Sequence, residues 1–280
     1  MKNILVPIDF SIVAEHATRL AMELAKSHKA TLHLLHVMQY STVSPLEPDG
    51  TFAATTYEKS AVERTLREGE IKLDNYFGKM NIYDSHVKKV YGLGDLEVVI
   101  SNKIDELDID LVVMGTQGTS GVKEVFFDSN AEKVVRNALC PVITIKDQTR
   151  MEDIKKIVFG SDLIYTSDQV ISRLKELQNL FNAQLYIVRV NTPDNFERDK
   201  VIRQVEEKIS LKLDSENVTI QTYNDVNPEK GLRHFADEHE ADMIALGTHG
   251  LKGLSHFFAG SIAEDLMNHT SKAVWTTHLK

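Results

Sequence analysis

Gly115-Thr116-Gln117-Gly118 and Gly247-Thr248-His249-Gly250 are two copies of one phrase, 132 residues apart, and each follows a short apolar run typical of a buried strand. A phrase repeated at this distance indicates two copies of one folding unit. Behind the second copy, Gly260-Ser261 completes the spacing G-x2-G-x9-G-S, whereas the first copy has Asp128-Ser129 at the same places. A glycine loop that leads into a helix start is a common phosphate site, because free N–H groups and the helix dipole favour an anion.

A second offset supports the repeat. Asp9 and Asp162 each end the first strand of a half, Val37 and Val190 each end the second strand, and both pairs are 153 residues apart. The two offsets differ by 153 − 132 = 21 residues, about the size of a stretch at 39–60 that is rich in Ser, Thr and Pro. We predict that this stretch is a long exposed loop, so that one insertion explains both offsets.

The sequences of the two halves predict the same order of strands and helices. In the first half we expect strands at 3–9, 31–38, 86–91, 111–114 and 142–146, and helices at 14–25, 58–80, 96–106 and from Ser129 onward. In the second half we expect strands at 156–161, 184–190, 218–223, 243–246 and 273–277, and helices at 167–182, 195–213, 228–239 and from Gly260 onward. Such alternation predicts parallel sheets with helices on both faces, which bind ligands at the carboxyl ends of their strands.

The boundary between the halves falls in the polar stretch Lys146–Asp153, so we predict domains at residues 1–148 and 149–280. About 140 residues suffice for a separate core. A linker this short leaves little freedom, and the two units should therefore pack against each other.

Charge and composition exclude several classes of partner. The net charge of −9 argues against nucleic acid and against an anionic membrane surface. We expect no signal peptide and no membrane span, and the single cysteine, Cys140, cannot form an internal disulfide and is expected to be a small buried residue. These features predict a cytoplasmic location.

The candidate binding residues combine glycine, serine and aspartate. In the second half Gly247, Gly250 and Gly260 would let a phosphate approach the backbone, and Ser261 would add a hydroxyl. The alternative is that these glycines only form a turn and Ser261 only caps a helix. A carboxylate at Asp9 or Asp162 would either accept hydrogen bonds from a ribose or amino group, or cap the helix that follows.

These residues resemble the universal stress proteins in their tandem two-domain form, and the resemblance covers nearly all 280 residues. In the first half it is carried by Val6-Pro7-Ile8-Asp9-Phe10-Ser11, Gly115-Thr116-Gln117-Gly118, Ser129-Asn130-Ala131-Glu132-Lys133-Val134-Val135 and Cys140-Pro141-Val142. In the second half it is carried by Gly247-Thr248-His249-Gly250 and Gly260-Ser261-Ile262-Ala263-Glu264.

The resemblance implies an α/β fold of two tandem doubly wound, five-stranded parallel sheets, Rossmann-like and of the adenine-nucleotide α-hydrolase type. The halves would pair by pseudo-twofold symmetry through Val142–Lys146 and Ala273–Thr277. The implied ligand is ATP or AMP, with the role of Mg²⁺ open. It would be bound by Asp162 near adenosine, the Val190 backbone at adenine, and Gly247, Gly250, Gly260 and Ser261 at the phosphates. The matching residues of the first half are Asp9, Val37, Gly115, Gly118, Asp128 and Ser129.

Both halves depart from the family pattern. Asp128 stands where binding members have glycine. A carboxylate about 4 Å from a phosphate charge costs ~4 kcal/mol at an effective dielectric of ~20. We therefore predict that the first site is degenerate and that nucleotide prefers the second half. The second half has Gly160 in place of Pro7, and Val226 where counting by 132 places Gly94.

The leading hypothesis is a stress-response or signalling protein in which the nucleotide is a conformational ligand and an unknown protein is the partner; a homodimer is left open. The alternatives are an interaction or scaffold protein with degenerate sites, and a slow ATP hydrolase or phosphotransferase. We expect no catalytic residue and no metal site. Residues 115–129 and 247–261 hold only Lys123 and Lys252 as cations, and His249 is the one candidate base.

Overall fold

The computed structural model of the chain describes residues 1–39, 56–116, 128–161, 168–193, 203–204, 207, 210, 217–249 and 259–279. In the first half the elements are β1 (Asn3–Pro7), α1 (Ile12–His28), β2 (Thr31–Met38), α2 (Thr56–Met80), β3 (Val87–Leu93), α3 (Leu96–Glu106), β4 (Leu111–Gly115), α4 (Asp128–Asn137) and β5 (Val142–Ile145). A short 3-10 helix, η1 (Met151–Asp153), precedes the second half.

In the second half the elements are β6 (Lys156–Gly160), α5 (Asp168–Phe181), β7 (Gln184–Asn191), β8 (Val218–Asn224), α7 (Pro228–Glu238), β9 (Met243–His249), α8 (Ala259–His269) and β10 (Ala273–Leu279). The predicted helix at 195–213 falls largely outside the described residues.

Several predicted boundaries are wrong by a few residues. α2 begins at Thr56, inside the stretch predicted as loop. β1 ends at Pro7 rather than Asp9, because the chain turns to start α1. β9 continues to His249 instead of ending at Leu246, because β10 pairs with it as far as the pair Leu279–His249. The first three residues of the second glycine phrase therefore belong to a strand.

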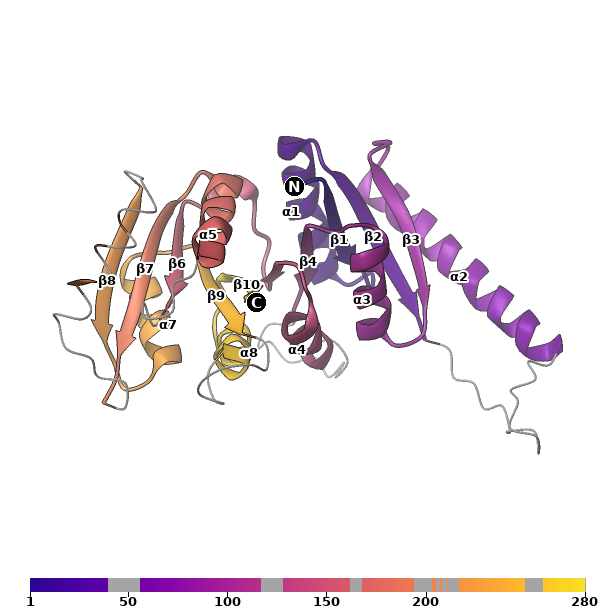
Figure 1. Ribbon diagram of the computed structural model, residues 1–280. Helices are drawn as coiled ribbons and strands as arrows, with labels where there is room; N and C mark the ends of the chain where they lie inside the picture. Colours follow the sequence, from indigo (N-terminus) through magenta and orange to yellow (C-terminus); the bar gives the residue numbers. More distant parts are fainter. Residues whose placement is uncertain are drawn as a thin grey trace, which may run out of the picture.

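The strands form one ten-stranded sheet in the order β3-β2-β1-β4-β5-β10-β9-β6-β7-β8. All pairs within a half are parallel, and the central pair, β5 with β10, is antiparallel. This confirms the predicted pairing of the two halves through their last strands. Figure 1 shows the two halves side by side, with β10 at the middle.

A separate hydrophobic core covers each face of the sheet, and each core runs through both halves. Alternate residues of a strand enter opposite cores; for example, Ile4 and Val6 join one and Leu5 joins the other. The first core takes residues from α1, α2 and α5, and the second from α3, α4, α7 and α8. Strands buried on both faces explain the apolar runs in the sequence.

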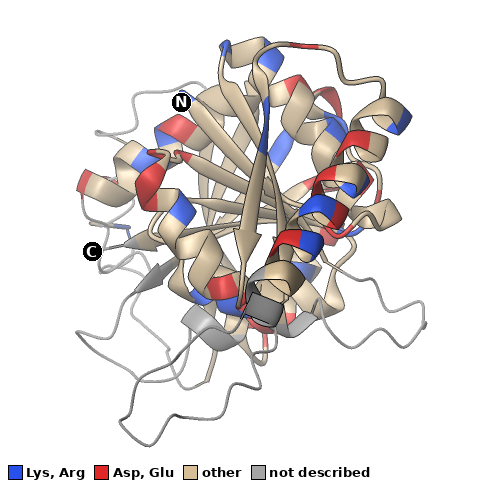
Figure 2. Ribbon diagram, turned by 90° about the vertical axis from the view of Figure 1, so that its right-hand side faces the viewer, with Lys and Arg blue, Asp and Glu red and all other residues tan. Residues whose placement is uncertain are grey.

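The outer edge of the first half carries charge. The edge strand β3 exposes Lys88 and Lys89, and Lys89 forms an ion pair with Asp74 of α2. Figure 2 faces this edge and shows basic and acidic segments alternating along the helix that crosses it. Lysines on an edge strand disfavour pairing with a further strand.

Each half also contains the same carboxylate clamp at the amino ends of its strands. Asp110 accepts a hydrogen bond from the backbone N–H of Asn3 at 3.0 Å. Asp242, 132 residues later, accepts hydrogen bonds from the backbone N–H groups of Lys155 and Lys156 at 2.8 and 2.9 Å. The clamp ties the start of the first strand of a half to the strand beside it.

Replacing Asp242 with alanine removes this acceptor from two backbone N–H groups. We expect the free energy of unfolding, measured by urea denaturation, to fall by about 1–3 kcal/mol. Glu240→Ala is the control, because the Glu240 side chain is 87% exposed and lies 3.7 Å from Lys156. It should change stability by less than about 0.5 kcal/mol. Equal losses in the two variants would contradict the clamp.

Candidate functional site

The strand order brings the predicted binding positions of each half to neighbouring strand ends. In the first half β1 lies between β4 and β2, so three adjacent strand ends carry Gly115 at the end of β4, the turn at Asp9 after β1, and Val37 near the end of β2. In the second half β6 lies between β9 and β7, which places Gly247 and Val190 on either side of the end of β6. Both sets are at carboxyl ends, where parallel α/β sheets bind ligands.

Part of the predicted set lies outside the described residues, namely Gly118, Asp162 and Gly250. For two other pairs the structure describes the backbone. Gly260 and Ser261 lie in the first turn of α8, and Asp128 and Ser129 lie in the first turn of α4. The predicted helix starts are thus confirmed, and the N–H groups of a first helical turn have no partner within the helix.

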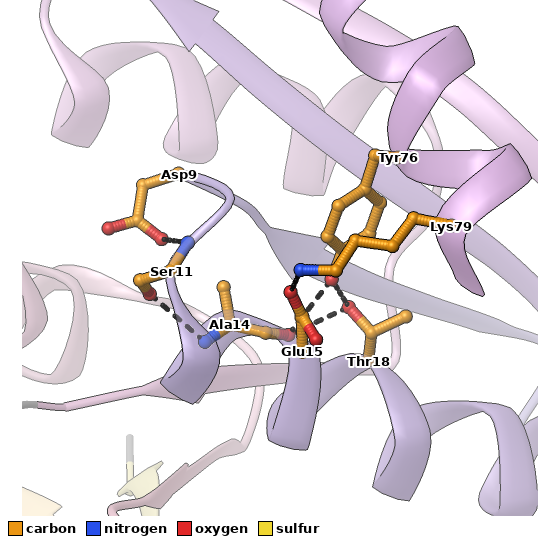
Figure 3. Close-up of polar contacts among 7 residues, drawn as sticks. All are labelled: Asp9, Ser11, Ala14, Glu15, Thr18, Tyr76 and Lys79. Atoms are coloured by element: carbon orange, nitrogen blue, oxygen red, sulfur yellow. Dashed lines mark hydrogen bonds and ion pairs between the residues drawn. The ribbon is translucent and has the colours of Figure 1, made fainter.

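Asp9 supports the turn that starts α1. Its Oδ1 accepts a hydrogen bond from the backbone N–H of Ser11 at 3.0 Å, and Ser11 Oγ accepts one from the N–H of Ala14 at 3.2 Å (Figure 3). Ser11 is therefore the N-cap, and Asp9 orders the residues just before it. Since Asp9 is also exposed, its carboxylate has a structural role while remaining accessible to a ligand.

Phe10 lies between Asp9 and Ser11 with a left-handed backbone, φ 68°. Its ring contacts His36 and Tyr76, with centroid distances of 4.5 and 5.6 Å. His36 Nδ1 lies 3.2 Å from the carbonyl of Ile8, so this nitrogen is the one that carries the proton. Burial lowers the pKa of His36, which keeps the ring neutral near pH 7. Aromatic packing therefore holds a turn whose conformation is unfavourable for phenylalanine.

A buried hydroxyl network anchors α2 to α1 directly behind this turn (Figure 3). Thr18 Oγ1 lies 2.8 Å from the Tyr76 hydroxyl and donates to the Ala14 carbonyl at 2.8 Å, while the Tyr76 hydroxyl lies 3.3 Å from the same carbonyl. Lys79 and Glu15 form an ion pair beside it. Burial raises the pKa of Tyr76 to about 12. The first-half turn is thereby fixed from behind by a protonated tyrosine.

Tyr76→Phe removes one hydroxyl from this network and leaves Thr18 bonded to Ala14. We expect the free energy of unfolding to fall by about 0.5–1.5 kcal/mol in urea denaturation. Tyr83→Phe is the matched control, because Tyr83 is 84% exposed, and should have little effect.

The same variant should alter the alkaline stability. The pKa of Tyr76 is about 12 in the folded chain, against about 10 for an unfolded tyrosine. From about pH 10 upward the unfolded chain releases this proton before the folded chain does, so stability falls as pH rises to about 12. This loss should be smaller in Tyr76→Phe, and Tyr83→Phe should retain it. An unchanged alkaline profile in Tyr76→Phe would contradict the assignment.

Packing explains the glycine at Gly115 of the first candidate site and at Gly231 of α7, beside Val190. A Cβ on Gly115 would lie 2.6 Å from Val13 Cγ1 and 2.8 Å from the Val13 carbonyl carbon, so α1 approaches the end of β4 only because the side chain is missing. A Cβ on Gly231 would lie 2.4 Å from Val190 Cγ1. The Val190 side chain is buried against α7.

The structure adds a polar pair that the sequence did not predict. Asp225 Oδ2 lies 2.7 Å from His234 Nδ1, and Asp225 Oδ1 accepts from the N–H of Val226 at 2.6 Å. Burial alone would raise the pKa of Asp225, but these hydrogen bonds outweigh it and hold the pKa below its ordinary value. No local sequence pattern links Asp225 with His234, because nine residues separate them. A contact over this spacing needs the loop before α7 to fold back on the helix.

The register corrects the predicted match of Val226 with Gly94. The N–H of Gly94 donates to the carbonyl of Met38 at 2.9 Å, and the N–H of Asp225 donates to the carbonyl of Asn191 at 3.1 Å. Asp225 therefore takes the place of Gly94, and Val226 is an extra residue that is 69% exposed. The second half thus has a carboxylate at a strand end where the first half has glycine.

Three further expectations concern chemistry and environment. Cys140 is buried, and burial raises its pKa to about 12, so the thiol is protonated. Within the described part of the chain, no three His, Cys, Asp or Glu side chains gather in a way that could hold a metal ion. Among the helices described, none is both long and apolar enough to cross a bilayer.

Comparison with known proteins gives one consistent family. The model of the Universal stress protein family matches residues 1–146 and 153–278. Universal stress protein G of Salmonella typhimurium is 32% identical over 147 residues, which is 52% of this chain and 99% of that protein. Universal stress protein MJ0531 of Methanocaldococcus jannaschii is 27% identical over 146 residues, 52% of this chain and 82% of that protein.

Solved structures match over both halves. A universal stress protein from Archaeoglobus fulgidus superimposes with a TM-score of 0.71 at 18% identity, covering 99% of this chain and 98% of that one. A putative universal stress protein from Pseudomonas aeruginosa gives a TM-score of 0.65 at 17% identity, with 99% and 93% covered. At these identities the likeness concerns the fold, and it extends to the tandem arrangement.

Proposed function

Because the chain belongs to the universal stress protein family, in a tandem two-domain form, we propose that it is a stress-response or signalling protein that binds ATP or AMP, chiefly in its second half. The observation that carries this proposal is the complete G-x2-G-x9-G-S spacing there, with Gly260 and Ser261 in the first turn of α8. The N–H groups of a first helical turn have no partner within the helix, and together with the positive end of the helix dipole they favour a phosphate at this place.

The strand ends beside α8 support the rest of the nucleotide. Gly247 belongs to β9, which lies next to β6, and β6 lies next to β7 with Val190 near its end. We propose that the phosphates lie over Gly247, Gly250, Gly260 and Ser261, that Asp162 takes the adenosine side, and that the Val190 backbone meets the base. Asp225, just beyond β8, is a carboxylate beside the end of β7, where its N–H donates to the carbonyl of Asn191.

The first half supports binding less well. Asp128 lies in the first turn of α4, at the place that Gly260 has in α8. Its negative charge opposes the attraction of the helix dipole for phosphate. The exposed Asp9 and the glycine at position 115 remain, but packing accounts for that glycine without a ligand. We propose that this first site is weak or empty.

The proposed role of the nucleotide is that of a ligand which shifts a conformational equilibrium, and not that of a substrate. Such a shift requires different affinities for the two conformations, and the Gly247–Ser261 segment is the proposed element that changes. A cytoplasmic protein partner of unknown identity would recognise the occupied state. The two alternatives are an interaction protein without nucleotide and a slow ATP hydrolase or phosphotransferase.

Calorimetric titration with ATP and AMP tests the preference for the second half. We expect Gly260→Asp to weaken binding several hundredfold or more, because a carboxylate about 4 Å from phosphate costs ~4 kcal/mol at a dielectric of ~20. Asp128→Gly should create or strengthen the nucleotide site in the first half. Gly78→Asp is the control, since it adds the same charge on α2 where a side chain has open space. Binding that survives Gly260→Asp unchanged would refute the assignment, and repetition with EDTA shows whether Mg²⁺ takes part.

A steady-state ATPase assay separates a conformational ligand from a substrate. We expect turnover far below the 1 s⁻¹ or so that marks a dedicated enzyme. The reason is that phosphoryl transfer needs a positioned water and strong stabilisation of charge, and neither glycine loop contains an arginine. Turnover near 1 s⁻¹ that disappears in Ser261→Ala or His249→Ala would establish the hydrolase alternative. Absence of binding at millimolar nucleotide would favour the interaction protein.

A further inference from the structure

The pair Ile143–Trp275 lies on the pseudo-twofold axis of the chain. In the β5–β10 ladder Thr144 pairs with Val274, Ile143 with Trp275, and Val142 with Thr276. Adding the repeat offset of 132 to residues 142, 143 and 144 gives 274, 275 and 276. The outer pairs therefore exchange with each other under the symmetry, whereas the central pair maps onto itself.

The central pair is also where the two halves differ. Each outer pair sets a valine of one half opposite a threonine of the other, so the halves are interchangeable there. At the axis one half supplies isoleucine and the other tryptophan. Both side chains are buried, 0% and 3% exposed, in the core on the α1 and α5 face. Side chains directly opposite in an antiparallel pair are about 4.5–5.5 Å apart at Cβ, so they fill one shared space.

Pairing of like halves would fill this space badly. Two copies of the first half would oppose Ile143 with Ile143 and leave a void, which costs stability. Two copies of the second half would oppose Trp275 with Trp275 and overfill the space, which also costs stability. One large and one small side chain fit only when the halves are different.

The polar contacts between α4 and α8 do not provide this discrimination. Arg136 forms an ion pair with Glu264, and the symmetry-related contact joins Asn268 Nδ2 to Glu132 Oε1 at 3.2 Å. Glu132 matches Glu264 and Arg136 matches Asn268 under the offset of 132. Two chains with unlike pairing contain two Arg–Glu and two Asn–Glu contacts. If the same four halves pair like with like, they again form two Arg–Glu and two Asn–Glu contacts.

We propose that the Ile143–Trp275 pair is the element that selects unlike pairing, so that each first half takes a second half as its partner in preference to a copy of itself. This is independent of nucleotide binding. The alternative to intrachain pairing is an interlocked particle of two chains, in which first half pairs with first half and second with second. Size complementarity at one residue pair acts against that product.

The test uses four forms of the full chain: wild type, Trp275→Ile, Ile143→Trp and the double exchange. Each is unfolded in urea and refolded at increasing protein concentration up to about 1 mM, because the short linker gives the halves an effective concentration in the millimolar range. Size exclusion with light scattering then measures the fraction of two-chain particles that persist after dilution. The single tryptophan, Trp275, reports by fluorescence on the seam of the wild type.

Trp275→Ile makes every pairing Ile–Ile, so the discrimination disappears. We expect its persistent two-chain fraction to exceed that of wild type by about tenfold, since an overpacked pair costs about 1–3 kcal/mol. The double exchange restores one tryptophan opposite one isoleucine and should return the fraction to the wild-type level. Ile143→Trp should refold poorly, because every pairing then sets tryptophan against tryptophan.

Phe235→Ile is the control for lost stability alone. Phe235 is a buried aromatic residue of α7, 1% exposed, in the opposite core and away from the seam. The Phe235→Ile variant should unfold at a lower urea concentration than wild type and keep the wild-type fraction of two-chain particles. The proposal is overturned if Trp275→Ile gives no more such particles than Phe235→Ile, or if the double exchange remains as high as Trp275→Ile. Neither comparison requires Ile143→Trp to fold.

Discussion

The antiparallel contact between β5 and β10 is the constraint on which the rest of the structure depends. Each half alone is a five-stranded parallel sheet whose last strand would leave an open row of backbone donors and acceptors. Joining the two last strands closes both edges at once and makes the two cores continuous across the halves. The short η1 segment fits this arrangement, because its Met151 N–H donates to Glu23 of α1 at 2.7 Å and binds the linker to the first half.

Sheet twist determines how the outer strands of the two halves are oriented relative to each other. The strands of the two halves are antiparallel at the seam, yet the arrows of β3 and β7 both point to the lower side of Figure 1. Neighbouring strands rotate by about 20–25°, and nine steps from β3 to β8 therefore accumulate roughly half a turn. The twist thus cancels the reversal at the seam. The carboxyl ends of the outer strands β3 and β7 therefore point to the same side of the molecule.

The repeat offsets and apolar runs were enough to predict the order of strands and helices along each half, because strands buried on both faces leave a strong pattern. The pairing of the halves through their last strands was implied by the family resemblance and the short linker. Element ends were harder. β9 extends to His249 because it pairs with the neighbouring strand β10, and no local sequence signal predicts that extension.

The pair Asp225–His234 was missed for a related reason. Counting back from the helix start aligns Val226 with Gly94, and only the hydrogen-bond register shows that Asp225 takes that place. The clamps at Asp110 and Asp242 likewise join strands far apart in sequence.

Fusion of the two units into one chain explains why they differ as they do. In a symmetric pair of identical units each residue must serve at both equivalent places. Here Thr18, which bonds to Tyr76, corresponds by the offset of 153 to Ile171, a buried core residue. The Thr18 hydroxyl behind the Asp9 turn therefore has no counterpart at Ile171, and the intact Gly260 is particular to the second half. These differences between the halves are combined in every molecule only if each first half pairs with a second half. A seam that fits unlike halves better than like ones meets this requirement through packing alone, and leaves the strand ends free to diverge.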